Sequence, residues 1–260
     1  MIWDALVLAA GRGPGDPMAR AFGVTHKCLL PVAGVPMLTW VVMALRAGPA
    51  IDRIVIAIED GAPLPPGLGD VKRIASKPMA AESAIFAATS GAVRYPLLVT
   101  TGDHPLLTAE MLAHFIGEAE RMKADLCAGL ARDKVILAAY PDTRRTFLAF
   151  GPDRVSGCNL FALKTPLALK ALEKWRFLET VRKKPWRLFG AFGVTALARF
   201  LTGRLSLDQA FEIASRQLGL TARPILMPFA EAAIDVDKPE DKVLAEEILR
   251  KRTQRASASP

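Results

Sequence analysis

A strand-like run that ends in a carboxylate is the first feature of this sequence that could support chemistry. The apolar stretch Pro96–Thr100 leads into Gly102-Asp103-His104-Pro105. Parallel sheets bind ligands at the carboxyl ends of their strands, and a carboxylate facing bound phosphates is a natural ligand for Mg²⁺. We therefore predict that Asp103 binds Mg²⁺; the alternative is a turn or helix-capping aspartate. His104, beside a proline, is predicted to be an exposed turn residue and not a catalyst.

A second pair of carboxylates lies near the C-terminus. Asp235 and Asp237 are two positions apart, just before Pro239. In an extended segment both side chains point the same way, so the two could share a cation. The alternative is that Asp237 caps the helix opened by Pro239 and that Asp235 is solvated. Which of the two aspartates binds metal stays open at this point.

The first strand-like run, Ala5–Leu8, leads into the glycine-rich turn Ala9-Ala10-Gly11-Arg12-Gly13, and Lys27 follows one loop later. Glycine allows backbone N–H groups to approach a phosphate closely, and lysine adds a mobile point charge. The alternative is an ordinary strand-to-helix turn. A dinucleotide-binding oxidoreductase is disfavoured because Asp16 stands where its third glycine belongs.

Composition limits the class of protein further. The chain has 260 residues, 51% of them hydrophobic, with a formal net charge of +8 and three widely spaced cysteines. An odd, scattered set of cysteines predicts no disulfide framework and a cytoplasmic location. The basic surplus suits an anionic substrate or surface. We expect no nucleic-acid partner, because the few aromatic residues are not interleaved with the basic ones.

Apolar runs alternate with helical patterns, which predicts βαβ units. We expect an α/β fold with three α/β/α layers, Rossmann-like, around a mixed, mostly parallel sheet. One domain should span residues 1–252, followed by a disordered tail at 253–260. The expected strands are Ala5–Leu8, Arg53–Ile58, Pro96–Thr100, Ala124–Gly129, Thr146–Phe150 and Pro224–Pro228. The expected helices are Pro36–Arg46, Ala80–Ala92, Ala109–Lys123, Pro166–Thr180, Leu207–Leu218 and Asp241–Arg252.

Residues 166–220 form a basic and apolar helical extension of this domain. Within it, residues 183–201 combine Lys183, Lys184 and Arg187 with Trp186 and Phe189. Such a mixture is typical of a helix at a membrane interface, so a peripheral membrane association is one expectation. The alternative is a helical hairpin packed on the core. The oligomeric state is not indicated by the sequence.

Taken together and in order, these motifs resemble the MobA-like nucleotidyltransferases of the glycosyltransferase-A-type fold. That superfamily includes molybdenum-cofactor nucleotidyltransferases and sugar- or polyol-phosphate nucleotidylyltransferases. The resemblance spans residues 5–241 and is specific for the superfamily but not for the substrate. It departs from the usual pattern where Pro14–Arg20 separates the glycine turn from Lys27, and where His26 replaces a common proline. The matching segments are Leu8–Gly13, Lys27–Pro36, Gly102–Leu107 and Asp235–Asp241.

The resemblance implies a role for each matched residue. Arg12, Lys27 and Asp103 would be catalytic, and Asp103 with Asp235 or Asp237 would bind Mg²⁺. Ser156 and Asn159 would bind hydroxyl groups of the acceptor; the alternative for both is a turn before a strand. The residues implied to bind the nucleotide are Leu8, Ala9, Ala10, Gly11, Gly13, Ser83 and Gly102.

The implied reaction is nucleotidyl transfer, in which a phosphorylated alcohol attacks the α-phosphorus of an NTP and releases pyrophosphate. We favour CTP as the NTP and a phosphorylated sugar or polyol as the acceptor, because the 166–220 extension exceeds what a minimal molybdenum-cofactor enzyme needs. The alternative is a molybdenum-cofactor guanylyl- or cytidylyltransferase. From a different class, a non-catalytic nucleotide-binding protein at a membrane surface remains open. A glycosyltransferase is disfavoured because Asp103 lacks the second aspartate of an Asp-x-Asp motif.

Overall fold

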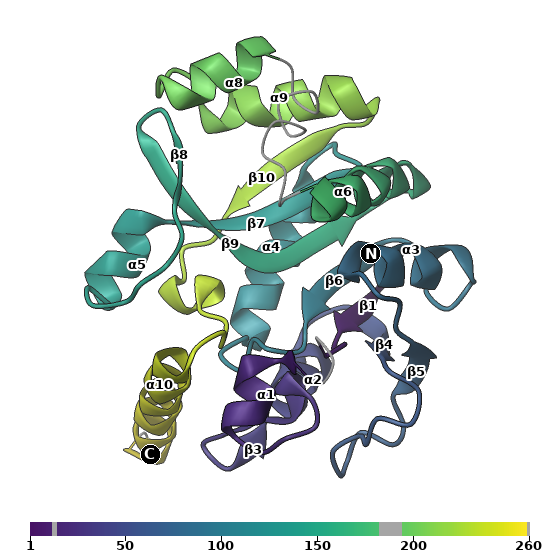
Figure 1. Ribbon diagram of the computed structural model, residues 1–260, viewed down its shortest axis with the longest axis vertical. Helices are drawn as coiled ribbons and strands as arrows, with labels where there is room; N and C mark the ends of the chain where they lie inside the picture. Colours follow the sequence, from purple (N-terminus) through teal and green to yellow (C-terminus); the bar gives the residue numbers. More distant parts are fainter. Residues whose placement is uncertain (12–14, 182–193, 259–260) are drawn as a thin grey trace.

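The computed structural model describes residues 1–11, 15–181 and 194–258. Its centre is an eight-stranded sheet with the strand order β10-β7-β9-β6-β1-β4-β5, in which β8 pairs with β9 (Figure 1). A small hairpin of β2 (Pro31–Val32) and β3 (Val35–Pro36) stands apart from it. The strands of the main sheet are β1 (Trp3–Leu8), β4 (Ile51–Ile58), β5 (Lys72–Ala75), β6 (Leu97–Thr101), β7 (Leu126–Arg132), β8 (Leu148–Phe150), β9 (Asp153–Leu163) and β10 (Ala222–Leu226).

Helices cover both faces of the sheet, and the alternate side chains of β1 pack against helices on opposite faces. Ala5 and Val7 are fully buried in one apolar cluster with α2 (Met37–Ala47) and α4 (Ala109–Arg121). Leu6 points the other way, into a second cluster with α3 (Ala80–Thr89) and α6 (Leu169–Val181). Side chains of a strand alternate between faces, so a wholly apolar strand needs helices on both sides. The predicted α/β class with a layered, mixed sheet is confirmed.

The remaining helices lie around this sandwich (Figure 1). They are α1 (Pro17–Ala21), α5 (Asp133–Ala139), α8 (Val194–Leu201), α9 (Leu207–Leu218) and α10 (Pro239–Ala258). In the described part of the chain, no helix combines the length and the apolar character that crossing a bilayer requires. Most of the stretch on which a membrane contact was expected, residues 183–193, lies outside the described residues.

The long strand β9 interrupts the parallel order. It runs antiparallel to both β6 and β7, whereas β1 pairs in parallel with β4 and β6. The β7–β9 register shifts between Ala128 and Leu130, and Asn159 opposite this shift has a left-handed φ of 50°. A bulge of this kind redirects the side chains of a strand. The bulge is what aims Asn159 at the carboxyl edge of the sheet, as described below.

A third apolar cluster fixes the segment that carries the C-terminal carboxylates. Ile234 and Val236 are fully buried together with Ile248 and Leu249 of α10. Alternate residues of an extended segment point to opposite sides. Because the side chains of Ile234 and Val236 are buried in this cluster, those of Asp235 and Asp237 point away from it.

Several elements differ from the sequence predictions. Strands β5 and β9 were not expected, and β7 begins two residues later than predicted and extends to Arg132. Helix α10 begins at Pro239 and continues to Ala258, where a disordered tail was expected from Thr253. Residues 253–258 contain neither glycine nor proline, and Gln254, Arg255 and Ala256 are good helix formers. The local sequence therefore does not end the helix at Arg252.

Candidate active site

Three carboxylates from distant parts of the chain meet at the carboxyl end of β6. One oxygen from each of Asp103, Asp235 and Asp237 lies within 4.8 Å of the others. Asp103 follows β6 directly, and the backbone N–H of Val236 donates to the Asp103 carbonyl at 3.0 Å, which joins the two segments. The structure thus brings together all three residues predicted as metal ligands.

Lys27 lies between two of these carboxylates. It begins a short 3-10 helix, Lys27–Leu29, and its Nζ donates to Asp103 Oδ2 at 2.6 Å and to Asp237 Oδ1. Burial disfavours the charged ammonium group, but Asp103 and Asp237 outweigh that cost and hold the pKa of Lys27 above its ordinary value. Lys27 is therefore a permanent cation at the site, as its predicted role requires.

Asp103 stays ionised and keeps one oxygen for a ligand. Burial acts to raise its pKa, but the charge and hydrogen bond of Lys27 outweigh it and hold the pKa below the usual value. Its Oδ1 is buried and has no hydrogen-bond partner in the structure. A buried charged oxygen without a partner is costly, and a divalent cation would satisfy it. Oxygen donors of this kind suit Mg²⁺.

Asp235 is held differently from its neighbours. Its Oδ1 accepts from Arg145 Nη1, and its Oδ2 accepts from Asn159 Nδ2 at 3.1 Å. Burial and the nearby charges of Asp103 and Asp237 raise the pKa of Asp235, against the opposing effect of Arg145. Arg145 was missed by sequence analysis, because it stands in no motif and reaches the site only through the fold.

The glycine turn adjoins the carboxylates. The N–H of Gly102 donates to the Leu8 carbonyl at 2.9 Å, and Ala9 pairs with Ala57. The N–H of Gly11 donates to Glu59 Oε1 at 2.8 Å, and His26 Nε2 lies 3.2 Å from the other Glu59 oxygen. An acidic side chain on this amide shows that the turn accepts an oxyanion. Ala10 is exposed beside it; Arg12 and Gly13 lie outside the described residues.

Gly102 allows three segments to approach closely. A Cβ at this position would lie 3.2 Å from the Cβ atoms of Ala9 and Cys28 and 3.4 Å from the Ala9 Cα. We expect Gly102→Ala to lower the free energy of unfolding by about 1–3 kcal/mol, because the methyl group forces packed segments apart. Urea denaturation measures this. Gly117→Ala in helix α4, where a Cβ meets nothing within 4 Å, should instead stabilise by about 0.5–1 kcal/mol. Equal urea midpoints for the Gly102→Ala and Gly117→Ala proteins would contradict this, because they would show that the packed segments move apart without loss of stability.

Ser83 and Ser156 complete the predicted set. Ser83, at the start of α3, is buried; its Oγ accepts from the Lys77 N–H at 2.8 Å and donates to the Met79 carbonyl at 3.2 Å. It therefore shapes the loop that precedes α3. Ser156 is half-buried on β9 opposite Ala131. Neither is a member of the carboxylate cluster.

The predicted exposure of His104 is wrong. The residue is only 1% exposed, and its Nε2 lies 3.1 Å from the Glu231 carbonyl. Burial lowers the pKa of His104, which favours the neutral imidazole. The proline that follows suggested an exposed turn, but the segment before α10 folds over this position and covers it.

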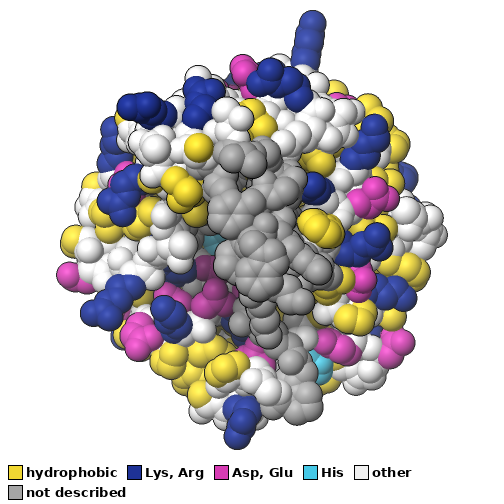
Figure 2. Space-filling view, turned by 45° about the horizontal axis from the view of Figure 1, so that its top comes forward, with side chains coloured by type: hydrophobic (Ala, Val, Ile, Leu, Met, Phe, Trp, Pro, Cys, Tyr) yellow, Lys and Arg dark blue, Asp and Glu magenta, His cyan; other side chains and the backbone are white. Residues whose placement is uncertain are grey.

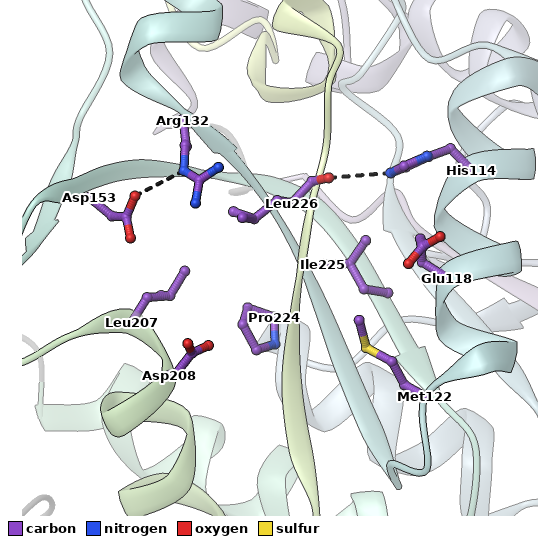
Figure 3. Close-up of a pocket in the computed structure, with 10 residues that line it drawn as sticks. All are labelled: His114, Glu118, Met122, Arg132, Asp153, Leu207, Asp208, Pro224, Ile225 and Leu226. Atoms are coloured by element: carbon purple, nitrogen blue, oxygen red, sulfur yellow. Dashed lines mark hydrogen bonds and ion pairs between the residues drawn. The ribbon is translucent and has the colours of Figure 1, made fainter.

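Two surface features bear on partners. Figure 2 shows Lys and Arg side chains of the described residues scattered among apolar and acidic ones on one face. Figure 3 shows a pocket of about 310 Å³ between α4, α9 and β10, beside the Arg132–Asp153 ion pair. None of the three clustered carboxylates lines this pocket.

Solved structures share the fold of this chain. A hypothetical transferase from Thermus thermophilus superposes with a TM-score of 0.80 at 32% identity, covering 93% of this chain and 100% of that one. The 2-C-methyl-D-erythritol 4-phosphate cytidylyltransferase from Thermus thermophilus shares the fold, with a TM-score of 0.54 at 17% identity over 96% of this chain and 100% of that one.

A curated relative matches part of the sequence. It is the 2-C-methyl-D-erythritol 4-phosphate cytidylyltransferase of Ralstonia nicotianae, 33% identical in an alignment of 130 residues that covers 45% of this chain. The match spans about half (49%) of that relative's length. The profile of the MobA-like NTP transferase domain matches residues 5–180, well over half of the chain. This chain therefore belongs to the MobA-like NTP transferase family.

Proposed function

We propose that this chain is a nucleotidyltransferase that transfers a cytidylyl group from CTP to a phosphorylated sugar or polyol and releases pyrophosphate, with Mg²⁺ as its cofactor. The observation that carries the proposal is the meeting of Asp103, Asp235 and Asp237 around Lys27, beside the glycine turn. The choice of CTP and of a polyol phosphate is supported by the cytidylyltransferase from Ralstonia nicotianae, whose match covers half its length.

The charge at the carboxylates supports the use of a metal. Among the described residues, the carboxylates of Asp103, Asp235 and Asp237 are paired with the cations Lys27 and Arg145. Arg145 also pairs with Asp241, so these four carboxylates outnumber the two cations by two, and the buried Asp103 Oδ1 lacks a partner. Mg²⁺ held by Asp103 and Asp237 would neutralise charge on the α-phosphate and orient it.

The residues of the chain then have separate tasks. Lys27 turns from the carboxylates to the β- and γ-phosphates and stabilises the pyrophosphate as it leaves. The Gly11 amide exchanges Glu59 for a phosphate oxygen. For Arg12 and Gly13, which lie outside the described residues, a role in phosphate binding rests on the sequence resemblance alone. Ser156 and Asn159 bind the acceptor from β9. No side chain forms a covalent bond, because the phosphate of the acceptor is itself the nucleophile.

Thermal stability with each of CTP, GTP, ATP and UTP, with and without Mg²⁺, tests the nucleotide. We expect CTP with Mg²⁺ to stabilise the protein, by about 2.7 kcal/mol at a hundredfold excess over Kd. Pyrophosphate release with CTP and a panel of phosphorylated polyols and sugars then tests the acceptor. Stabilisation by GTP alone would favour the molybdenum-cofactor enzyme. Binding of CTP without turnover on any acceptor would favour a non-catalytic nucleotide-binding protein.

A further inference from the structure

We propose that Arg145 is a positioning residue that holds the metal-binding segment 235–241 in its active geometry. The inference rests on the proposed function, because it assigns Arg145 a task toward the Mg²⁺ site. Arg145 precedes β8, far in the sequence from Asp103 and Asp235, and its side chain is 7% exposed. A buried guanidinium requires strong partners, and each of its described partners belongs to one short segment.

The contacts of Arg145 span that segment. Nη1 donates to Asp235 Oδ1, and Nη2 donates to the Asp235 backbone carbonyl at 2.7 Å and to Asp241 Oδ1 at 3.0 Å. One rigid, planar fork therefore joins two residues at opposite ends of the turn into α10. Lysine offers a single point charge and cannot reproduce this bridge.

Asp241 connects Arg145 to the backbone at Asp237. Its second oxygen, Oδ2, accepts from the backbone N–H groups of Asp237 at 3.0 Å and Lys238 at 2.9 Å. The same carboxylate thus caps the start of α10 and binds Arg145. Asp237 does not cap the helix itself, which leaves its carboxylate for Lys27 and for a metal.

The three carboxylates differ in how many of their oxygens are already hydrogen-bonded. Both oxygens of Asp235 are committed, one to Arg145 and one to Asn159. Asp103 retains a buried oxygen without a partner, and Asp237 has the most exposed side chain of the three, at 45%. We infer that Asp103 and Asp237 contact the metal directly, while Asp235 and Arg145 orient the segment behind them.

The test measures metal binding separately from activity. Mn²⁺ is titrated into the full chain with CTP present, and the unbound ion is followed by its electron paramagnetic resonance signal. Arg145→Met should raise the Kd for Mn²⁺ by about tenfold to a hundredfold. Arg145→Lys keeps the charge but loses the fork, so its Kd should lie between those of Arg145→Met and the wild type.

Arg132→Met is the matched control. It removes an arginine that pairs with Asp153 at 2.9 Å but stands 40% exposed beside the pocket of Figure 3. We expect its Kd for Mn²⁺ to stay within twofold of wild type. If Arg145→Met does not fold, judged by its circular dichroism spectrum, the comparison is made on Arg145→Lys.

The outcomes separate this inference from the proposed function. Wild-type Mn²⁺ affinity in a folded Arg145→Met or Arg145→Lys protein overturns the positioning role while the proposed function stands. An equal loss in Arg132→Met also overturns it, because the effect would then follow from removing any ion pair. If the wild-type protein binds no Mn²⁺ with CTP, both the inference and the metal-dependent function fail.

Discussion

Asp103→Asn lowers kcat by about a thousandfold or more, which corresponds to about 4 kcal/mol of transition-state stabilisation. The substitution keeps the shape of the side chain but removes the charge of the carboxylate that Lys27 holds ionised. It also replaces one carboxylate oxygen by an NH₂ group, which cannot bind a cation. Because Lys27 requires an acceptor at the position of Oδ2, the replaced atom is the buried Oδ1 that has no partner in the structure. Both losses act on the group proposed to hold Mg²⁺, so metal binding should weaken together with turnover. Pyrophosphate release and Mn²⁺ titration measure the two effects.

Asp153→Asn provides the control for charge removal alone. Asp153 pairs with Arg132 and is partly exposed, at 26%, so we expect its variant to retain wild-type turnover. The Asp103→Asn protein should fold, because its side chain packs at an edge and not within an apolar cluster. Turnover of the folded variant within tenfold of wild type would contradict the metal assignment of Asp103.

Lys27→Met reduces turnover by at least about a hundredfold, the typical loss for one preorganised donor to a developing charge. In the absence of nucleotide the same variant should bind Mn²⁺ more tightly than wild type. The reason is that Lys27 Nζ occupies Asp103 and Asp237, two of the carboxylates that would hold the metal. Removing the ammonium group therefore raises the local negative charge. A loss of turnover together with tighter Mn²⁺ binding distinguishes this effect from unfolding, which would weaken both.

Lys242→Met is the control for Lys27. Lys242 pairs with Glu246 on the same face of α10, and that pair joins neither of the two site carboxylates. We expect its variant to match wild type in turnover and in Mn²⁺ affinity. If Lys27→Met bound Mn²⁺ more weakly than wild type, the ammonium would have to support the metal site, and the proposed exchange between carboxylates and phosphates would be wrong.

Local patterns predicted the centre of the sheet well. The apolar runs of β1, β4 and β6 were identified because strands buried on both faces consist almost entirely of aliphatic residues. The meeting of Asp103, Asp235 and Asp237 was also predicted. The carboxyl ends of parallel strands meet at one edge, and Ile234 and Val236 fix the direction of the alternation.

What the sequence did not reveal depends on contacts between distant segments. The polar residues of β9 obscure the apolar pattern of a strand, and this segment is extended because it pairs with β6 and β7. Arg145 and Glu59 reach the site only through the arrangement of the loops. His104 is buried by Glu231 and the turn around it, which no pattern near residue 104 encodes. Periodicity reports which face is apolar, but it does not report what later covers a polar residue.

The bond between Lys27 and Asp237 joins positions 210 residues apart. A ribosome releases the N-terminal strands first, so β1, β4 and β6 can associate long before Asp237 has been synthesised. Until then the Asp103–Lys27 pair exists without the partners that complete the cluster. A chain interrupted before Asp235 would lack two of the three clustered carboxylates, so under the proposed function it should not turn over nucleotide. The proposed site is therefore complete only after the segment 235–241 has been synthesised and has folded against β6.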